Sequence, residues 1–361
     1  MSEINKEKKI IVFSGGGTGG SVAPLLALKE YLNQKHSQWD FVWFGTRNGL
    51  ERTMVLETDM KYVGIFSGKL RRYFSFKNLV DIFKIIIAFF QSLIYLKRLS
   101  PNLVMSAGGF VSVPLAFAAK LLAIPVIVHQ QDVRAGLANK LMAKVAKKVT
   151  VTFSESIDDY GEKAVLTGNP VRQAFKGLGN KYEFLKSLNL QIDKPILTII
   201  GGGQGSKKIN DLVGQSVSYL NKELQIVHIT GSKNKKIKNQ NNYLSYSFVS
   251  AKKMAQIMSV SDLLVSRCGL GFISELSYLK KTVIFIPMPF SHQEDNAKLI
   301  AKHGAGMVLD QNNLTDSNFK ENILNLVKDK NKSLEMANNL YSLISKEAEK
   351  NISYIIEKYV K

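Results

Sequence analysis

Two glycine-rich segments have the composition and spacing of phosphate-binding loops. The first is Gly15–Ser21 (GGGTGGS) and the second is Gly201–Ser206 (GGGQGS). Each follows a short apolar run and precedes a stretch with helical periodicity. Glycine lets an anion approach the backbone closely, and the amino end of a helix supplies unpaired N–H groups and a positive dipole end. We therefore interpret both segments as candidate anion-binding loops.

The first segment also matches the fingerprint of dinucleotide-binding loops, as Gly15-x-Gly17-x-x-Gly20. The acidic residue that normally closes the next strand for NAD is absent, because Thr46 and Arg47 stand there. An arginine at this point suits the 2′-phosphate of NADP, so an NADP-dependent oxidoreductase is one alternative function. The second segment lacks the third glycine of the fingerprint, and neither segment ends in the Lys-Ser/Thr of a P-loop.

The elements that must position these loops alternate along the chain. Short β-branched runs alternate with amphipathic stretches such as 24–34 and 272–279, which predicts an α/β fold with parallel sheets. Two strand–glycine loop–helix openings predict two Rossmann-like domains, 1–172 and 173–339, with a linker at 168–172. A final helix is expected within 333–360, and its part from about 340 to 361 is expected to pack back on the first domain. The predicted strands are Ile10–Phe13, Phe41–Phe44, Leu103–Ser106, Val126–His129, Lys148–Val151, Ile196–Ile200, Gln225–Ile229, Leu263–Ser266 and Val283–Ile286.

Composition narrows the class of protein. The chain has 361 residues, which suits two domains, and its 49 basic and 29 acidic residues give a formal net charge of +20. Such a balance favours an anionic partner. Nucleic acid is not the expected one, because no nucleic-acid-binding motif accompanies the charge. The single cysteine, Cys268, excludes a disulfide within the chain. We expect no signal peptide and no transmembrane helix.

Seven segments, taken together and in order, resemble a known family. The set is similar to the MurG family of UDP-N-acetylglucosamine transferases, glycosyltransferase family 28, which convert lipid I to lipid II in peptidoglycan synthesis. The resemblance implies a GT-B fold with two Rossmann-like domains facing a cleft, inversion at the anomeric carbon, no metal, and no cofactor besides UDP-GlcNAc as substrate. The segments are Gly15–Pro24, Gly108–Pro114, His129–Asn139, Thr167–Arg172, Gly201–Ser206, Ser266–Glu275 and Ser291–Ala297.

The resemblance implies that the second domain binds the UDP-sugar. The two arginines of the set would hold phosphate, because a guanidinium binds it bidentately. Glu275 would accept hydrogen bonds from the ribose hydroxyls, and two amide side chains would contact the sugar. Alternatives remain: Glu275 as a favourable charge in the first turn of a helix, and Asn296 as a helix cap. The implied donor-binding residues are Arg172, Gly203, Gln204, Gly205, Ser206, Arg267, Glu275, Gln293 and Asn296.

The resemblance assigns a polyprenyl-diphosphate-linked acceptor to the first domain, where this chain departs from the family pattern. The family has a histidine in place of Ser21, a tyrosine in place of Phe110 and His-Glu-Gln-Asn in place of 129–132. On the donor side, Gly203 replaces a serine and Phe272 a threonine. A related glycosyltransferase with another acceptor, or a weakly active homologue, is therefore a second hypothesis. The implied acceptor-binding residues are Gly17, Thr18, Gly19, Gly20, Phe110, Gln131 and Asn139.

The candidates for the general base are Asp132, His129 and Ser21. A serine hydroxyl titrates far above neutral pH and cannot hold a proton as a free base. Asp132 replaces a neutral amide of the family pattern, and a carboxylate in a partly dry site would have its pKa raised toward the working pH. The commoner role for an aspartate at this position is to cap a helix that would begin near Arg134.

One stretch of the first domain has the composition of a membrane-facing segment. Basic residues frame the aromatic ones in 69–77, and the following run 77–98 is apolar except for one narrow polar stripe at helical spacing. A buried helix explains the run as well as a membrane-facing one. The basic and aromatic lead-in favours peripheral binding to an anionic membrane surface, and the resemblance implies the cytoplasmic face of the bacterial inner membrane.

Overall fold

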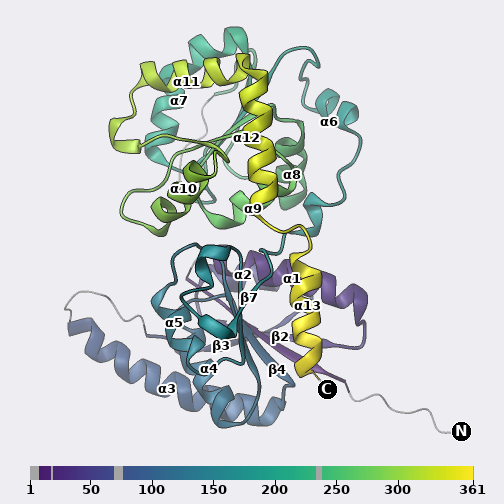
Figure 1. Cartoon of the computed structure of the whole chain (residues 1–361), viewed down its shortest axis with the longest axis vertical. Helices are drawn as coiled ribbons and strands as arrows, with labels where there is room; N and C mark the ends of the chain where they lie inside the picture. Colours follow the sequence, from purple (N-terminus) through teal and green to yellow (C-terminus); the bar gives the residue numbers. More distant parts are fainter. Residues whose placement is uncertain (1–7, 18, 69–75, 233–237, 361) are drawn as a thin grey trace, which may run out of the picture. The chain divides into compact units, whose positions relative to one another are not determined.

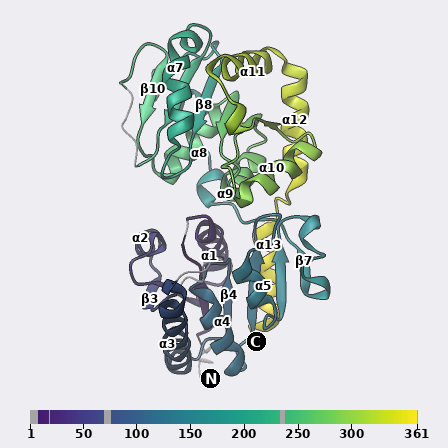
Figure 2. The same cartoon turned by 90° about the vertical axis from the view of Figure 1, so that its left-hand side faces the viewer.

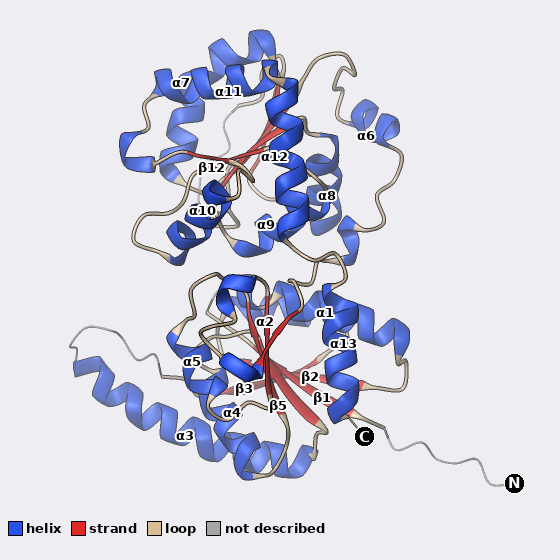
Figure 3. Cartoon of the chain, in the orientation of Figure 1, coloured by secondary structure: helices blue, strands red, loops and turns tan. Residues whose placement is uncertain are grey.

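The computed structural model describes residues 8–17, 19–68, 76–232 and 238–360, and the side chains of all of these except 76–80. The chain divides into two compact units (Figures 1 and 2). The first contains Met1–Arg172 and Ser345–Lys361, and the second contains Gln173–Ile344. Each unit is built on a parallel sheet flanked by helices (Figure 3). The predicted α/β class is confirmed.

The first unit has a parallel sheet in the order β3-β2-β1-β4-β5-β6-β7. Its strands are β1 (Ile10–Ser14), β2 (Asp40–Thr46), β3 (Lys61–Ile65), β4 (Leu103–Ser106), β5 (Val126–Gln130), β6 (Lys148–Val151) and β7 (Ala164–Leu166). Its helices are α1 (Ala23–Lys35), α2 (Leu50–Leu56), α3 (Phe76–Leu99), α4 (Ser112–Leu121), α5 (Leu137–Ala143) and α13 (Ala348–Tyr359).

Both faces of this sheet are buried, because successive strand residues point to opposite faces and both sets are apolar. Ile11 and Phe13 of β1 enter a core that α1 and α13 cover. Val12 enters a second core that α3, α4 and α5 cover. Helix α13 therefore completes the first unit, although it lies at the far end of the chain.

The second unit repeats this architecture, with the sheet order β10-β9-β8-β11-β12-β13. Its strands are β8 (Ile196–Ile200), β9 (Gln225–Ile229), β10 (Tyr243–Tyr246), β11 (Leu263–Ser266), β12 (Val283–Phe285) and β13 (Met307–Val308). Its helices are α6 (Lys181–Ser187), α7 (Lys207–Glu223), α8 (Ala251–Val260), α9 (Leu270–Tyr278), α10 (His292–Lys302), α11 (Asp316–Lys328) and α12 (Lys330–Leu343). Helices α7, α11 and α12 cover one face of the sheet.

The single final helix expected within 333–360 is instead two helices, α12 and α13. The backbone of Ile344 is extended, and the Ser345 hydroxyl accepts a hydrogen bond from the Glu347 N–H at 3.3 Å. This local side-chain bond competes with helix continuation, as serine commonly does. The second unit extends through α12 to Ile344, and the expected end at 339 lies inside that helix.

The strand order in each sheet reverses beside the strand that precedes a glycine loop. In the first sheet this point lies between β1 and β4, and in the second it lies between β8 and β11. Connections on the two sides of such a point leave in opposite directions, so a crevice opens at the carboxyl ends of the strands. Each glycine loop therefore stands where doubly wound sheets bind ligands.

Candidate active site

In the first unit, the loop that follows β1 packs against the loop that follows β4. Gly17 has φ of +91°, and Gly108 and Gly109 have φ of +105° and +95°. Only glycine adopts these conformations readily. A Cβ on Gly109 would lie 2.6 Å from the Gly16 carbonyl oxygen, so the two backbones touch directly. The glycines therefore serve close backbone packing here as well as access for a ligand.

A buried carboxylate fastens this first glycine loop. Glu51 of α2 is fully buried, and its Oε1 accepts hydrogen bonds from the N–H and the hydroxyl of Thr46, at 2.9 and 2.6 Å. Its Oε2 accepts one from the Gly17 N–H at 3.5 Å. Glu51 thus links the end of β2 to the loop. Glu51 was not predicted from the sequence, where its one signal is a carboxylate in the first turn of a helix that closely follows a strand.

Three predicted acceptor-binding residues gather around this loop. The Phe110 ring lies over Gly17, at 3.5 Å from the position of a Cβ there. Gln131 Nε2 donates to the Ala107 carbonyl at 3.3 Å, which ties the loop after β5 to the loop after β4. Asn139 is buried, and its Oδ1 lies beside Gly108 and has no hydrogen-bond partner among the residues that the structure describes.

The remaining predicted acceptor residues follow Gly17 directly. Gly19 and Gly20 form the short 3-10 helix η1 (Gly19–Ser21), and Gly20 is exposed. Ser21 is buried and donates to the Gly16 carbonyl at 3.4 Å. This bond holds the loop closed. Thr18 lies outside the described residues.

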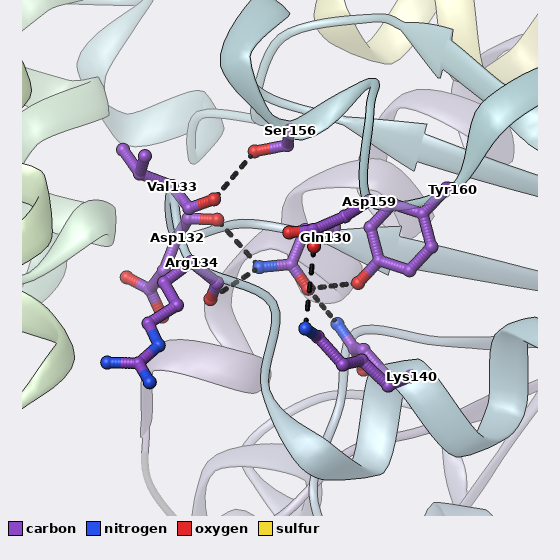
Figure 4. A network of polar contacts seen from close by, with 9 residues as sticks. Gln130, Asp132, Val133, Arg134, Lys140, Ser156, Asp159 and Tyr160 are labelled. Atoms are coloured by element: carbon purple, nitrogen blue, oxygen red, sulfur yellow. Dashed lines mark hydrogen bonds and ion pairs between the residues drawn. The ribbon is translucent and has the colours of Figure 1, made fainter.

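The loop that carries Asp132 is held by Gln130 (Figure 4). Gln130 Nε2 donates to the carbonyls of Asp132 and Arg134, at 2.6 and 3.2 Å. Gln130 Oε1 accepts from Asn139 Nδ2 at 2.7 Å and from the Tyr160 hydroxyl at 2.8 Å. All four hydrogen-bonding positions of this amide are used. The amide therefore fixes the backbone of the loop.

Asp132 is half-buried and lies just beyond the carboxyl end of β5. Its carboxylate points away from the Gln130 amide (Figure 4). The capping alternative was wrong: helix α5 begins at Leu137, its N-cap is Gly136, and no side chain caps it. Asp132 therefore has no role in starting that helix, and it lies at the carboxyl edge of the sheet.

His129 occupies a different environment. It is fully buried, with Nδ1 at 2.9 Å from the Thr150 hydroxyl and Nε2 at 2.9 Å from Asn169 Oδ1. Burial lowers the pKa of His129 to about 4, although the hydrogen bond with Asn169 and the backbone of Thr150 act in the opposite direction. The ring is therefore neutral at pH 7 and both nitrogens are occupied. This geometry favours a structural role and does not favour His129 as the base.

In the second unit, Arg267 joins three loops at the carboxyl edge of the sheet. Its Nη2 donates to the Ser206 hydroxyl and to Gln311 Oε1, each at 2.6 Å. Its Nη1 donates to the carbonyls of Ile286 and Pro287, at 3.1 and 3.0 Å. Both terminal nitrogens are thus engaged by the protein. Arg267 therefore fixes the loops in place and contributes its positive charge beside the second glycine loop.

The second glycine loop ends at the N-cap of α7. The Ser206 hydroxyl accepts from the Ile209 N–H at 3.4 Å, which places the positive end of this 17-residue helix at the loop. Gly202 and Gly205 have φ of +95° and +82°. Of the other predicted donor residues here, Gly203 accepts a backbone hydrogen bond from Ser232, and Gln204 is exposed. The loop is electropositive and open to an anion.

The amide residues and Glu275 lie on the helices that follow β11 and β12. Asn296 is buried within α10 and donates to the Cys268 carbonyl at 3.0 Å, so it is not a helix cap. Gln293 Oε1 accepts from the Met288 N–H at 3.0 Å. Glu275 is buried and sixth in α9, so the first-turn alternative was also wrong. Arg172 is half-buried and ends the first part of the first unit.

The fold and these loops define a class of protein, and the family models agree. The model for the glycosyltransferase family 28 N-terminal domain matches residues 11–151. The model for the C-terminal domain of the same family matches residues 196–353. The chain belongs to glycosyltransferase family 28, and it is a hexosyltransferase with the GT-B fold.

Within that family the chain is similar to the MurG enzymes. It is 39% identical to the UDP-N-acetylglucosamine–N-acetylmuramyl-(pentapeptide) pyrophosphoryl-undecaprenol N-acetylglucosamine transferase of Clostridium kluyveri, covering 97% of this chain and 99% of that protein. The Clostridium novyi protein of the same name is also 39% identical, with the same coverage. The crystal structure of Acinetobacter baumannii MurG matches with a TM-score of 0.74 at 26% identity, covering 97% of this chain and 99% of that one. The predicted relationship is confirmed, and the NADP-dependent alternative is left without support.

Proposed function

We propose that this chain transfers N-acetylglucosamine from UDP-GlcNAc to the muramyl 4-hydroxyl of lipid I, which gives lipid II for peptidoglycan synthesis. The observation that carries the proposal is the full-length match to relatives named for this reaction. Within the second unit, a glycine loop, a helix amino end and a fixed arginine meet at one edge of the sheet. This arrangement suits the diphosphate of a nucleotide sugar.

The donor half stabilises the leaving group. As the anomeric carbon is attacked, negative charge develops on the UDP phosphate that departs. The amino end of α7 and the guanidinium of Arg267 supply preorganised positive charge beside Gly201–Ser206. Glu275 would accept hydrogen bonds from the ribose hydroxyls, and Gln293 and Asn296 would orient the sugar.

The acceptor half supplies the base. The muramyl hydroxyl must lose its proton as it attacks the sugar. Asp132 is a half-buried carboxylate on a loop that the Gln130 amide holds, at the carboxyl edge of the first sheet. We assign it as the general base. Ser21 then has a structural role, because its hydroxyl donates a hydrogen bond to the Gly16 carbonyl within the glycine loop.

Helix α3 supports binding to a membrane surface. One face of α3 packs into the first unit through Ala88, Ser92 and Leu96. The opposite face is exposed and apolar, which excludes the interpretation of α3 as a wholly buried helix. An amphipathic helix with such a face lies in the membrane interface. The exposed apolar residues are Ile82, Phe83, Ile86, Ile87, Phe90 and Ile94.

We infer that the enzyme is a peripheral protein on the cytoplasmic face of the bacterial inner membrane, and the exposed apolar face of α3 supports this inference. Lys97 and Arg98 are exposed at the end of α3, and basic side chains of this kind are attracted to anionic lipid. The basic and aromatic residues 69–75 lie outside the described residues. In the described part of the chain, no helix is long and apolar enough to cross a bilayer.

Ligand binding tests the donor assignment. UDP and UDP-GlcNAc should raise the melting temperature of the full chain by mass action, while NADPH should not. Transfer is then followed as UDP release with lipid I in detergent micelles. Stabilisation by NADPH alone, or UDP release that is independent of lipid I, would contradict the proposed reaction.

A further inference from the structure

Phe290 has an unusual combination of exposure and backbone conformation. Its side chain is 98% exposed, and its φ is +57°. A bulky residue in the left-handed region is an outlier, because its Cβ crowds the backbone, and such strain destabilises the folded protein. Glycine would relieve that strain, and a polar residue would relieve the exposure. The position therefore retains an aromatic ring at a cost to the folded protein.

The loop around Phe290 is rigid, so the ring is held in place. Pro287 and Pro289 fix two φ angles and restrict the residues before them. The Ser291 hydroxyl donates to the Met288 carbonyl at 2.6 Å and caps α10 by accepting from the Gln293 N–H at 3.3 Å. Gln293 Oε1 accepts from the Met288 N–H at 3.0 Å. These hydrogen bonds and the two prolines restrict the loop, so the exposed position of Phe290 is set by the loop conformation.

The loop also belongs to the donor edge of the second unit. Pro287, three residues before Phe290, accepts a hydrogen bond from Arg267, which also holds Ser206 at the second glycine loop. Helix α10 begins two residues after Phe290 and is tied to the loop after β11 through Asn296. A ligand whose phosphates lie at Gly201–Ser206 thus has this loop beside it, within the same unit.

We propose that Phe290 recognises the pyranose ring of the donor by stacking against its apolar C–H face. This inference rests on the proposed function and names a specificity-determining contact for it. A sugar ring presents hydroxyls around its rim and C–H groups on its face. The amide side chains of Gln293 and Asn296 in α10 can hydrogen-bond to the hydroxyls at the rim, and the exposed Phe290 ring can pack against the C–H groups of the face. The favourable contact in the complex offsets the strain and exposure of the ring in the free protein.

The test compares UDP-GlcNAc with UDP, because only the former carries the pyranose. Phe290→Ala should weaken UDP-GlcNAc binding by about 2- to 12-fold in calorimetry, and leave UDP binding unchanged. Phe290→Tyr keeps the ring and should bind both ligands as the parent protein does. Tyr182→Ala removes another exposed aromatic ring of the same unit and is the matched control. Phe290→Gly relieves the backbone strain and should raise the melting temperature while still losing the UDP-GlcNAc preference.

The outcomes separate this inference from the function on which it rests. If the parent protein binds both ligands and Phe290→Ala binds UDP-GlcNAc equally well, the stacking contact is refuted and the donor assignment stands. If Phe290→Ala instead raises only the KM for lipid I, the ring contacts the acceptor and the inference is also refuted. If the parent protein binds neither ligand, the donor assignment itself has failed.

Discussion

Gln130 and Asp132 stand where the family pattern has a glutamate and an asparagine, so the carboxylate has moved two residues along the chain. The amide at 130 donates to the carbonyls of Asp132 and Arg134. An ionised carboxylate has no proton to donate, so a glutamate could not make these bonds. With glutamine at position 130, the amide fixes the loop backbone, and the Asp132 carboxylate points away from that amide (Figure 4). This is the physical basis for assigning Asp132 as the base.

The base assignment predicts a defect in turnover alone. Asp132→Asn keeps the shape of the side chain and removes the proton acceptor, so kcat should fall by about 10²-fold or more. UDP affinity, measured by calorimetry, should be unchanged, and Ser21→Ala should cost much less. Normal turnover by Asp132→Asn would place the base elsewhere.

Glu275 should control affinity for the nucleotide. Removing a buried acceptor for the ribose hydroxyls costs ~1.5–3 kcal/mol, so Glu275→Ala should bind UDP about tenfold more weakly or worse. Glu275→Asp should lose less, because it keeps the charge. Glu183→Ala changes an exposed carboxylate of the same unit and is the control. UDP affinity equal to that of the parent protein would refute the ribose assignment.

At the scale of elements, the carboxylate of Glu357 adds a polar contact to the apolar packing of helix α13 beside α1. Glu357 Oε1 accepts from Lys35 Nζ at 2.7 Å and lies 3.0 Å from His36 Nε2. Burial raises the pKa of Glu357, but hydrogen bonds from His36, Lys35 and Ser353 outweigh it and bring the pKa to about 2. Because the folded pKa lies below the ordinary value of 4.5, this contact stabilises the protein above about pH 4.5. That contribution is lost as the pH falls toward 2.

Glu357→Gln should therefore lower the free energy of unfolding at pH 7 by about 1 kcal/mol, since the site is partly screened by solvent. The difference from the parent protein should shrink between pH 4.5 and pH 2. Urea unfolding followed by tryptophan fluorescence measures it, because both tryptophans, Trp39 and Trp43, lie in the first unit. Glu347→Gln, in an exposed pair with Lys350, is the control. A difference that persists unchanged at pH 3 would contradict this account.

Central strands were predictable from sequence, while edge strands were not. β4, β6, β8, β9 and β11 have the predicted bounds, because strands buried on both faces are rich in apolar and β-branched residues. The strands that were not predicted are β3, β7, β10 and β13. Each lies at an edge of its sheet, where a strand pairs with one neighbour only and can have fewer apolar residues.

The candidate site divides in a similar way. The glycine loops could be recognised from their composition. Glu51 could not, because it lies 35 residues from Gly16 in the sequence and contacts it only after folding. The start of α5 was misplaced because its N-cap, Gly136, carries no side chain to signal it. Whether a polar side chain such as that of Arg267 or His129 binds a ligand or a neighbouring loop depends on partners that sequence order does not reveal.

At the scale of the whole molecule, the two units use one architecture for different partners. The second unit has the electropositive glycine loop that we assign to the nucleotide. The first unit has Asp132 and the exposed apolar face of α3. A soluble donor and a lipid-linked acceptor require this division. The net charge of +20 also favours association with an anionic surface.

Membrane binding should therefore depend on α3. Phe83→Ser combined with Phe90→Ser should reduce co-sedimentation with anionic vesicles by at least about tenfold, because each buried phenylalanine contributes ~1.5–3 kcal/mol. Salt should weaken vesicle binding by the parent protein. A triple variant with Arg71, Arg72 and Lys77 changed to glutamine should also bind more weakly than the parent protein at the same salt concentration. Ile192→Ser with Leu334→Ser, two exposed apolar residues of the second unit, is the control. Equal sedimentation of the α3 variant and the parent protein would exclude this surface.

The reaction itself is tested most directly by the product. The full chain is incubated with UDP-GlcNAc and lipid I, and the lipid fraction is analysed by mass spectrometry and NMR. The account predicts UDP and a lipid that has gained one N-acetylglucosamine on the muramyl 4-hydroxyl, in the β configuration that inversion produces. Lipid I recovered unchanged, while the same preparation binds UDP-GlcNAc and glycosylates a different polyprenyl-linked acceptor, would contradict it.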